Sequence, residues 1–495
     1  VAGTGEDTAQ DEAQEHQPWK AVRLLFWFAG RYLSDLADLP FHVQNQHVAL
    51  LRWYLPAAEP RKVNSQLPPI TNGNTSDMAS DVHPVTEDSQ GLVFNEEERR
   101  DDVKPGRKPI CDLSNTKSDI CEADGDVRII GKDTRMIYVA NSQFINRDTG
   151  ESWTIKPYAR KWDKGSGAKV REVTMKLVKS HGEDKHCDVN HSVPALVFAI
   201  GGWTGNFFHD FADVLVPLFE TSYHFEGEVQ FLIANIKPLW IKKYHKYFEK
   251  LSRYEIIDYD NDDRVHCFKQ VTLGLRCDQG DFTINPSKDP YGYTMADFAK
   301  FTRSAYSLKR DHPVRPAEQA GKKPRILIVT RKATRKFMNV KEIVHMTKKL
   351  GFNAVVTEAD ANITRFSQVV NSCDVMMGVH GSGLTNIVFL PTHSVVIQVV
   401  PWGNLDWIAG NYFRDPSRQM KLHYLEYSIN EEESTLSELY PRDHAVFKDP
   451  MSLHHQGWDT FSRIFLVEQN VKLDVRKFRP VLEHALQLLR EQQYT

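Results

Sequence analysis

The sequence predicts an α/β protein made of two units of alternating strands and helices that face a cleft, preceded by a disordered stem. Three observations carry this prediction. Short apolar, β-branched runs alternate with helix-length segments between residues 127 and 252, and again between residues 325 and 400. Such alternation is typical of strand–helix–strand units with a parallel sheet. Residues 55–108, by contrast, are rich in Pro, Asn, Ser, Asp and Glu and poor in aromatic residues.

The N-terminal 108 residues are expected to lie outside the folded part. Residues 1–20 are polar and acidic, and residues 21–54 carry apolar and aromatic side chains at a helix-compatible spacing. A segment with the composition of 55–108 cannot bury enough apolar surface to offset the entropy of ordering its chain. Residues 1–108 are therefore assigned to an N-terminal segment and flexible stem.

The first α/β unit is assigned to residues 109–315. Its expected strands are 127–130, 136–139, 193–200 and 228–234, and its expected helices are 206–219 and 239–252. The strand that ends at Ile200 runs into a glycine turn, Gly201-Gly202, which precedes the helix beginning at Asn206. This order of strand, turn and helix places polar side chains of the helix start at a strand end.

The second α/β unit is assigned to residues 322–479, after a polar, proline-containing linker at 311–324. Its expected strands are 325–330, 353–357, 375–379 and 395–400, and its expected helices are 340–350 and 366–371. Residues 480–495 form the last segment, in which a helix over 480–493 is expected to pack back against one unit.

Charge and hydropathy limit the partners of the chain. Its 495 residues carry 62 basic and 65 acidic side chains, and no basic stripe is interleaved with aromatic residues. Nucleic acid is therefore not an expected partner. The best candidate for a membrane span, residues 21–30, contains Arg23 and is well short of the roughly 20 residues needed to cross a bilayer.

Cysteines and sequons favour an oxidising compartment. None of the six cysteines forms a Cys-x-x-Cys pair, so structural zinc is not expected. Cys111 with Cys121, and Cys267 with Cys277, are near enough in sequence to close short disulfide loops, whereas six reduced core cysteines are the alternative in a cytosolic protein. Three Asn-x-Ser/Thr sequons favour the lumenal interpretation and N-glycosylation at Asn74, Asn190 and Asn362.

The most informative segment is 378–386, which contains His380, Gly381, Ser382 and Gly383 between an apolar strand and an apolar helical run. The glycines let the backbone approach a ligand without an intervening Cβ. Unpaired N–H groups and the positive end of the helix dipole favour an anion such as phosphate, and the histidine and serine add side-chain donors. An ordinary strand-to-helix turn has the same spacing, so this segment does not decide the function alone.

Several separated motifs together resemble the plant glycosyltransferases of family 61. They are the segment 378–386, the segment 201–219, and shorter matches at 157–162, 371–374, 398–403 and 440–444. The resemblance extends from about residue 109 to the C-terminus and is greatest to the grass xylan arabinosyl- and xylosyltransferases, although Ser382 stands where many relatives would carry Ala. It implies a GT-B fold of two Rossmann-like units. It also implies a type II Golgi membrane enzyme with a lumenal catalytic domain, whose anchor is not visible in this sequence.

The second unit is predicted to bind a UDP-sugar. Arg331 and Arg335 follow a strand end, where guanidinium groups can match diphosphate oxygens, although a solvated basic loop is the alternative. Glu358 could accept hydrogen bonds from ribose or be an ordinary surface residue. Asn386 would hold the turn or touch the nucleotide, and Trp402 would pack on the sugar or base, or in the core. The complete expected donor-binding set is Arg331, Arg335, Glu358, His380, Gly381, Ser382, Gly383, Asn386 and Trp402.

The first unit is predicted to hold the acceptor and the catalytic base. His209 and Asp213 are four residues apart on one helix face, and Asp210 lies next to the histidine. Inverting glycosyl transfer needs one base, and a histidine oriented by a carboxylate fits that role at neutral pH. We expect His209 to be the base, assisted by Asp213 or Asp210; carboxylates that merely stabilise the helix N-terminus are the alternative.

Neither a metal nor an obligatory cofactor is expected. Asp258 and Asp260 form the one Asp-x-Asp pair considered, and the polar residues after it indicate a turn. Cationic side chains and a helix N-terminus can stabilise departing UDP instead.

The predicted function is inverting transfer of a pentose, from UDP-arabinofuranose or UDP-xylose, onto xylan or arabinoxylan in the Golgi lumen. Three alternatives stay open. The first is β1,2-xylosylation of N-glycan cores, and the second is a non-catalytic carbohydrate-binding subunit of a Golgi complex. The third is a generic cytosolic nucleotide-binding protein, against which the sequons and the stem count.

Overall fold

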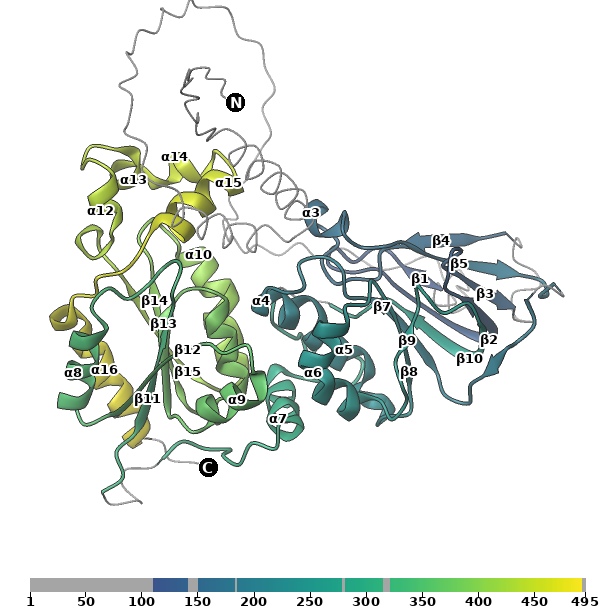
Figure 1. Cartoon of the computed structure of the whole chain (residues 1–495), viewed down its shortest axis with the longest axis horizontal. Helices are drawn as coiled ribbons and strands as arrows, with labels where there is room; N and C mark the ends of the chain where they lie inside the picture. The colour runs from purple at the N-terminus through teal and green to yellow at the C-terminus, as the bar shows by residue number, and fades with distance from the viewer. Residues whose placement is uncertain (1–109, 141–149, 183–184, 278–280, 315–320, 492–495) are drawn as a thin grey trace, which may run out of the picture. The chain divides into compact units, whose positions relative to one another are not determined.

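The computed structural model describes residues 110–140, 150–182, 185–277, 281–314 and 321–491, which form two β-sheets with helices packed on them (Figure 1). The predicted α/β class is confirmed. Residues 1–108, with the sequon at Asn74 and the apolar run 21–30, lie outside the described residues. Among the described residues, no helix combines the length and apolar character that a membrane span requires.

The first sheet mixes parallel and antiparallel strand pairs. Its strands are β1 (Cys111–Asp112), β2 (Ile120–Ile130), β3 (Met136–Ala140), β4 (Ser152–Ile155), β5 (Val173–Val178), β6 (Val189–Asn190), β7 (Ala195–Ala199), β8 (Gln230–Ala234), β9 (Ile257–Asp258) and β10 (Val265–Leu273). β10, β7, β8 and β9 run parallel, whereas β2 pairs antiparallel with β10 and β3, and β4 with β5. The parallel arrangement expected for this unit therefore covers only part of it. Burial explains the difference, because β7 and β8 are buried throughout, whereas β2 alternates buried and more accessible residues as a one-sided antiparallel strand does.

A continuous helical rod follows β7, as predicted. The helices of this unit are α3 (Lys164–Gly167), α4 (Phe207–His209), η3 (Asp210–Leu215), α5 (Val216–Ser222), η4 (Tyr223–Phe225), α6 (Pro238–Leu251) and α7 (Met295–Ala305). Asn206 caps the rod by accepting a hydrogen bond from the Phe208 N–H. The middle of the rod is a π-helix, in which the Val216 N–H donates to the Phe211 carbonyl. Pro217 cannot donate to the carbonyl of Asp213, which favours a widened turn at this place.

The second sheet is fully parallel, in the order β12-β11-β13-β14-β15. Its strands are β11 (Arg325–Thr330), β12 (Asn353–Glu358), β13 (Val375–Val379), β14 (Val395–Val400) and β15 (His423–Ser428). Its helices are α8 (Val340–Lys349), α9 (Ile363–Asn371), η5 (Ser382–Phe389), α10 (Asp406–Ala409), η6 (Gly410–Arg414), α11 (Asp415–Gln419), η7 (Glu431–Glu433), α12 (Leu436–Leu439), α13 (Ala445–Lys448), α14 (Pro450–His454), α15 (Trp458–Phe461), η8 (Ser462–Glu468) and α16 (Val475–Glu491). The four predicted strands are confirmed, and β15 was not predicted because its half-buried residues are mostly polar or aromatic.

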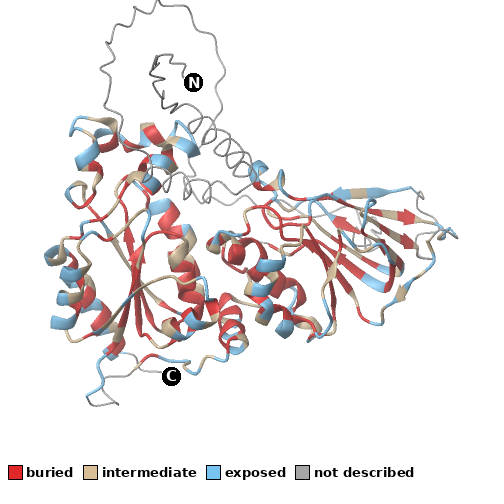
Figure 2. Ribbon diagram, viewed as in Figure 1, coloured by how far each residue is buried: buried red, intermediate tan, exposed pale blue. Residues whose placement is uncertain are grey.

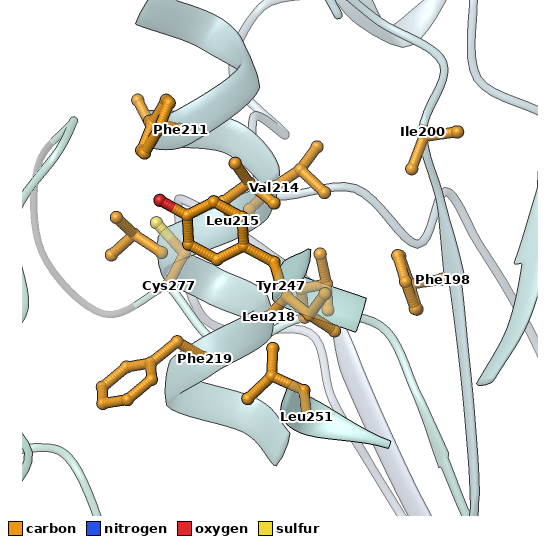
Figure 3. Packing of buried hydrophobic residues seen from close by; sticks show 14 of the residues in the cluster. Phe198, Ile200, Phe211, Val214, Leu215, Leu218, Phe219, Tyr247, Leu251 and Cys277 are labelled. Carbon is orange, nitrogen blue, oxygen red and sulfur yellow. The ribbon is translucent and has the colours of Figure 1, made fainter. Parts of the chain in front are cut away.

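The two faces of this sheet pack into different cores. Ile326 and Ile328 of β11 lie in the core covered by α8 and α16, whereas Leu327 and Val329 lie in the core that includes α9 and η5 (Figures 1 and 2). The core that includes α9 and η5 also contains the buried side of the helical rod. Figure 3 labels Phe211 and neighbouring residues of this core. This continuous core fixes η5 against the rod.

The C-terminal helix α16 begins before the expected residue 480. Asp474 accepts hydrogen bonds from the N–H groups of Arg476 and Lys477, so it caps a helix that starts at Val475. Pro480 therefore lies inside the helix and not at its first position. The helix packs on β14, β15 and α8, in agreement with the expectation that it folds back on one unit.

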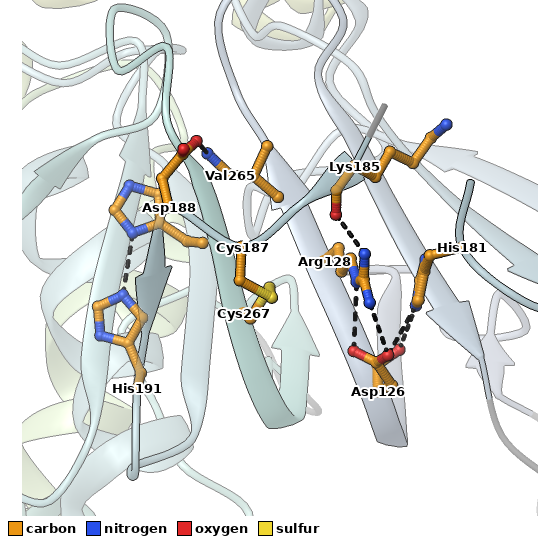
Figure 4. Close-up of a disulfide and its surroundings, with 10 residues drawn as sticks. Asp126, Arg128, His181, Lys185, Cys187, Asp188, His191, Val265 and Cys267 are labelled. Carbon is orange, nitrogen blue, oxygen red and sulfur yellow. Dashed lines mark hydrogen bonds and ion pairs between the residues drawn. A yellow bond between two sulfur atoms is a disulfide. The ribbon is translucent and has the colours of Figure 1, made fainter. Parts of the chain in front are cut away.

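Two disulfides are present among the described residues. Cys111 pairs with Cys121 as expected, but Cys267 pairs with Cys187, so the expected pairing with Cys277 is wrong (Figure 4). Cys277 is instead a buried thiol in the core of Figure 3, where burial raises its pKa. Cys373 is likewise a buried thiol.

Candidate active site

The rod that follows β7 brings His209 and Asp213 together. Their separation of four residues places both side chains on one helix face, and Nδ1 of His209 lies 3.0 Å from Oδ2 of Asp213. The Asp213 side chain is 1% exposed, whereas that of His209 is 23% exposed. Nε2 of the imidazole has no hydrogen-bond partner among the described residues. The imidazole is thus oriented on its buried side and open on the other.

Two residues of the segment 157–162 hold Asp213 in place. The Tyr158 hydroxyl donates to Oδ2 at 2.7 Å, and Nε of Arg160 lies 3.0 Å from each carboxylate oxygen. Burial and the charge of Asp213 raise the pKa of Tyr158, which therefore stays a donor. Although burial alone would lower the pKa of Arg160, Asp213 and Asp281 raise it. An added Cβ at Gly202, where φ is +53°, would lie 2.4 Å from the Tyr158 ring, so the glycine turn makes room for this tyrosine.

Asp210 points to a different set of partners. Its carboxylate accepts hydrogen bonds from the Gly205 N–H, the Trp240 indole and the Tyr244 hydroxyl, and also pairs with Lys243. The side chain is fully buried. Because the next residue along a helix points about 100° away, Asp210 does not reach the imidazole and instead ties the rod to α6. Of the two carboxylates considered from the sequence, the structure brings only Asp213 to His209.

The turn between β13 and η5, which contains Gly381, lies against two arginine side chains. Gly381 has φ of +147°, and an added Cβ would lie 2.8 Å from Nη1 of Arg331 and 3.0 Å from Nη1 of Arg335. Glycine suits this position because L side chains rarely adopt its φ, and because a Cβ would force a guanidinium group to shift. Ser382 and Gly383 begin η5, and Asn386 donates to the Gly383 carbonyl at 2.9 Å. Asn386 is buried, so it holds the turn, which is the first of its two predicted roles.

Neither of these arginines has a carboxylate within ion-pair distance in the described part of the chain. Nε of Arg331 donates to the Thr334 carbonyl, and Nη1 of Arg335 donates to the His380 carbonyl. Desolvation lowers the pKa of both, and the charge of Arg331 lowers the pKa of Arg335 further. Glu358, which lies beyond ion-pair distance, raises the pKa of Arg331 and offsets part of its charge. Because desolvated cations with so little counter-charge are costly, this pair is suited to an incoming anion.

His380 lies beneath the same turn as a neutral imidazole. Burial, followed by the charges of Arg335 and Arg331, lowers its pKa to about 3. Its Nδ1 is 2.8 Å from the Gln398 amide, and that amide is 2.9 Å from the Tyr424 hydroxyl. His380 therefore contributes hydrogen bonding and shape to the anion site, and no charge.

Tyr412 connects the two groups of residues. It belongs to the π-helix η6, and its ring is stacked on His380 with 6.5 Å between centroids and lies 4.8 Å from the Phe208 ring. Burial, followed by the charge of Asp281 and a hydrogen bond to that residue, raises the Tyr412 pKa to about 12. Asp281 in turn pairs with Arg160, the partner of Asp213, at 3.0 Å. The residues around His209 and those around Gly381 are therefore linked by a continuous run of contacts.

The structure also shows the surroundings of Glu358, Trp402 and Asp260, three other residues considered from the sequence. Glu358 pairs with Lys332, whose side chain is 88% exposed. Trp402 donates its indole N–H to the Val446 carbonyl and packs near Phe447, which corresponds to the core alternative. Asp260 accepts from the Asn235 N–H within a polar turn, as expected, and no group of three or more His, Cys, Asp or Glu suited to a metal ion occurs among the described residues.

Sequence reasoning did not assign roles to Tyr158, Arg160, Asp281 or Tyr412. The first two lie in a segment that supported the family resemblance, which was the available signal. No local pattern marks Asp281 or Tyr412, because tertiary packing alone brings them to the site.

Comparison with known proteins places the chain in a family. Residues 205–397 match glycosyltransferase 61, a region that begins just before His209 and ends in β14. Over 407 residues the chain is 47% identical to alpha-1,3-arabinosyltransferase XAT3 of Oryza sativa subsp. japonica, covering 82% of this chain and 69% of XAT3. The chain belongs to glycosyltransferase family 61. As a family 61 member it is a glycosyltransferase, and its two α/β units have a GT-B-like arrangement.

Two further family 61 relatives carry different names. Beta-1,2-xylosyltransferase XYXT1 of Oryza sativa subsp. japonica is 43% identical over 77% of this chain and 84% of its own length. Xylan glycosyltransferase MUCI21 of Arabidopsis thaliana is 34% identical over 76% of this chain and 78% of its own.

Proposed function

We propose that this family 61 glycosyltransferase moves a pentose, arabinofuranose or xylose, from a UDP-sugar onto xylan or arabinoxylan with inversion at the anomeric carbon. The names of the relatives support the sugar and the acceptor, since they are an arabinosyltransferase, a xylosyltransferase and a xylan glycosyltransferase. One structural observation carries the chemistry. A single open imidazole nitrogen, on His209, lies in the same site as two guanidinium groups that lack carboxylate partners among the described residues.

His209 is the general base of this reaction. Its Nε2 takes the proton from an acceptor hydroxyl as that oxygen attacks the anomeric carbon. The bond between the anomeric carbon and the phosphate oxygen breaks, and UDP leaves with the electron pair. Asp213, hydrogen-bonded to Nδ1, fixes the ring and stabilises the imidazolium that forms. Direct attack with one base gives inversion, because no enzyme nucleophile intervenes.

Arg331 and Arg335 stabilise the leaving UDP. Their positive charges lie next to Gly381, where the backbone N–H groups that open η5 add further donors. Preorganised cations of this kind can carry the charge that develops on a diphosphate. We therefore propose that transfer needs no divalent metal and no cofactor, with Ser382, Gly383 and His380 completing the diphosphate site.

We further propose that the enzyme works in the Golgi lumen, attached to the membrane and associated with other Golgi enzymes. Two disulfides support an oxidising compartment. Asn190 and Asn362, the two described sequon residues, are both exposed and therefore accessible for glycosylation.

The test is a panel of donors and acceptors. Purified protein is incubated with UDP-arabinofuranose, UDP-xylose and related sugar nucleotides, each with xylo-oligosaccharides, and products are identified by mass spectrometry. We expect one added pentose and stoichiometric UDP with at least one of the two pentose donors. Transfer of hexoses only, or binding of xylan without any product, would contradict the proposal.

A further inference from the structure

Two adjoining hollows open at one edge of the first unit, separate from the donor residues. The first, of about 210 Å³, is lined by Gly131, Asp133, Arg135, Arg171 and Asp260. The second, of about 300 Å³, is lined by Thr134, Arg135, Lys156, Val170, Glu172 and Thr174. Because Arg135 lines both, the two hollows are neighbours, and we call them together the distal groove.

The distal groove is connected to the catalytic histidine by direct contacts. Its wall includes Val170 and Arg171. The preceding residue, Lys169, packs on the Gly201-Gly202 turn, where an added Cβ at Gly201 would lie 2.4 Å from the Lys169 carbonyl. Nζ of Lys169 also lies 3.8 Å from the centre of the Trp203 ring, and that ring is 6.5 Å from His209. Lys169 and Trp203 therefore link the wall of the groove to the neighbourhood of His209 through a run of contacts.

The chemistry of the groove differs from that of the arginine pair. Its lining combines the cations Arg135, Arg171 and Lys156 with carboxylates from Asp133, Asp260 and Glu172. Balanced charges do not favour an anion, but they offer both hydrogen-bond donors and acceptors. Sugar hydroxyls both donate and accept hydrogen bonds, so they fit such a surface.

The groove also contains a buried carboxylate in an ion pair and two non-glycine residues with positive φ. Asp260 is 5% exposed, its Oδ1 has no hydrogen bond of good geometry, and Arg171 lies 3.0 Å away as its ion-pair partner. Asp133 and Arg135 have φ of 61° and 51°, a conformation that non-glycine residues seldom adopt. The fold thus maintains a fixed polar wall at this edge at a conformational cost.

We propose that the distal groove is an acceptor subsite that binds neutral pentose units of the xylan chain away from the residue that receives the sugar. This inference rests on the proposed function, since it assumes a xylan acceptor. It predicts that the enzyme favours long acceptors over short ones, because only a long chain reaches both His209 and the groove.

The experiment compares acceptor lengths in a groove variant. Lys156→Ala/Glu172→Ala removes two exposed side chains from the groove wall, while the ion pair between the buried Asp260 and the half-exposed Arg171 stays in place. The matched control is Arg479→Ala/Glu483→Ala, which removes one exposed ion pair from α16. For each protein, kcat/KM is measured with xylohexaose and with xylobiose, and the ratio of the two values is compared.

We expect the hexaose-to-biose ratio to fall about fivefold to tenfold in the groove variant, mainly through KM, because the lost contacts hold ground state and transition state alike. The ratio should be unchanged in the control. An unchanged hexaose-to-biose ratio in the groove variant would overturn the inference. The proposed function would still hold in that case, provided that the wild-type enzyme transfers sugar to xylo-oligosaccharides. Absence of wild-type transfer to either acceptor would instead remove the proposed function.

Discussion

Replacing Arg331 by Met should weaken UDP binding and, at the same time, stabilise the empty protein. A Cβ at Gly381 would lie 2.8 Å from Nη1 of Arg331 and 3.0 Å from Nη1 of Arg335, so these two nitrogens are at most about 6 Å apart. At an effective dielectric constant of about 20, two unit charges at that distance repel by about 3 kcal/mol. Glu358 offsets part of this at Arg331. Removing one charge therefore relieves on the order of 1–2 kcal/mol in the empty site.

The positive charge of Arg331 becomes favourable once UDP is bound. Hydrogen bonds between a guanidinium and a phosphate contribute about 1.5–3 kcal/mol, so the UDP dissociation constant should rise about 10- to 150-fold. Calorimetric titration with UDP measures the affinity, and thermal unfolding without UDP measures the stability. Lys332→Met is the control, because Lys332 is a solvent-exposed neighbour paired with Glu358 and should change neither quantity much. An Arg331→Met protein that unfolds earlier but binds UDP as tightly would show that Arg331 is a structural residue.

Three further outcomes are expected. Asp213→Asn should lower kcat by about 100-fold or more at unchanged UDP affinity, since it removes the carboxylate that stabilises the charged His209; a loss of affinity with normal kcat would contradict this. Transfer assayed in EDTA should match transfer with Mn²⁺ or Mg²⁺, and strict loss with metal-dependent recovery would show that the arginines are not sufficient. His380 has a folded pKa of about 3, below its unfolded value of about 6.5, so the unfolded state binds the extra proton and stability falls as pH drops. Between pH 6.5 and 4.5 this lowers the free energy of unfolding by about 2 kcal/mol. Urea titrations at both pH values should show that His380→Gln loses less of this free energy than the wild type does. An equal loss in both proteins would refute the buried neutral imidazole.

Much of the second unit could be predicted from the sequence because its signals are local. Buried parallel strands such as β11, β13 and β14 are continuous apolar runs, and their predicted bounds coincide with those in the structure. The glycine at position 381 is likewise a local signal for close packing against the backbone, which in the structure involves the side chains of Arg331 and Arg335. The mixed strand directions of the first sheet were not predicted, since alternation along β2 does not say which strand is its neighbour.

The candidate site was only half predictable for the same reason. The i, i+4 relation of His209 and Asp213 is a property of one helix and follows from spacing. The disulfide from Cys187 to Cys267 spans 80 residues, and the contact of Tyr412 with His380 also depends on distant packing. Spacing could not separate Asp210 from Asp213 as the partner of the base, because the burial of Asp210 against α6 is a tertiary fact.

The most direct test of the account is the reaction of His209→Ala with a UDP-pentose and a xylo-oligosaccharide, measured together with UDP affinity. We expect the variant to bind UDP as wild type does, because His209 is not among the residues around Gly381, and to form product at least about 100-fold more slowly, because no other base replaces its Nε2. Product formation at the wild-type rate would contradict the central claim that this imidazole accepts the proton of the acceptor hydroxyl.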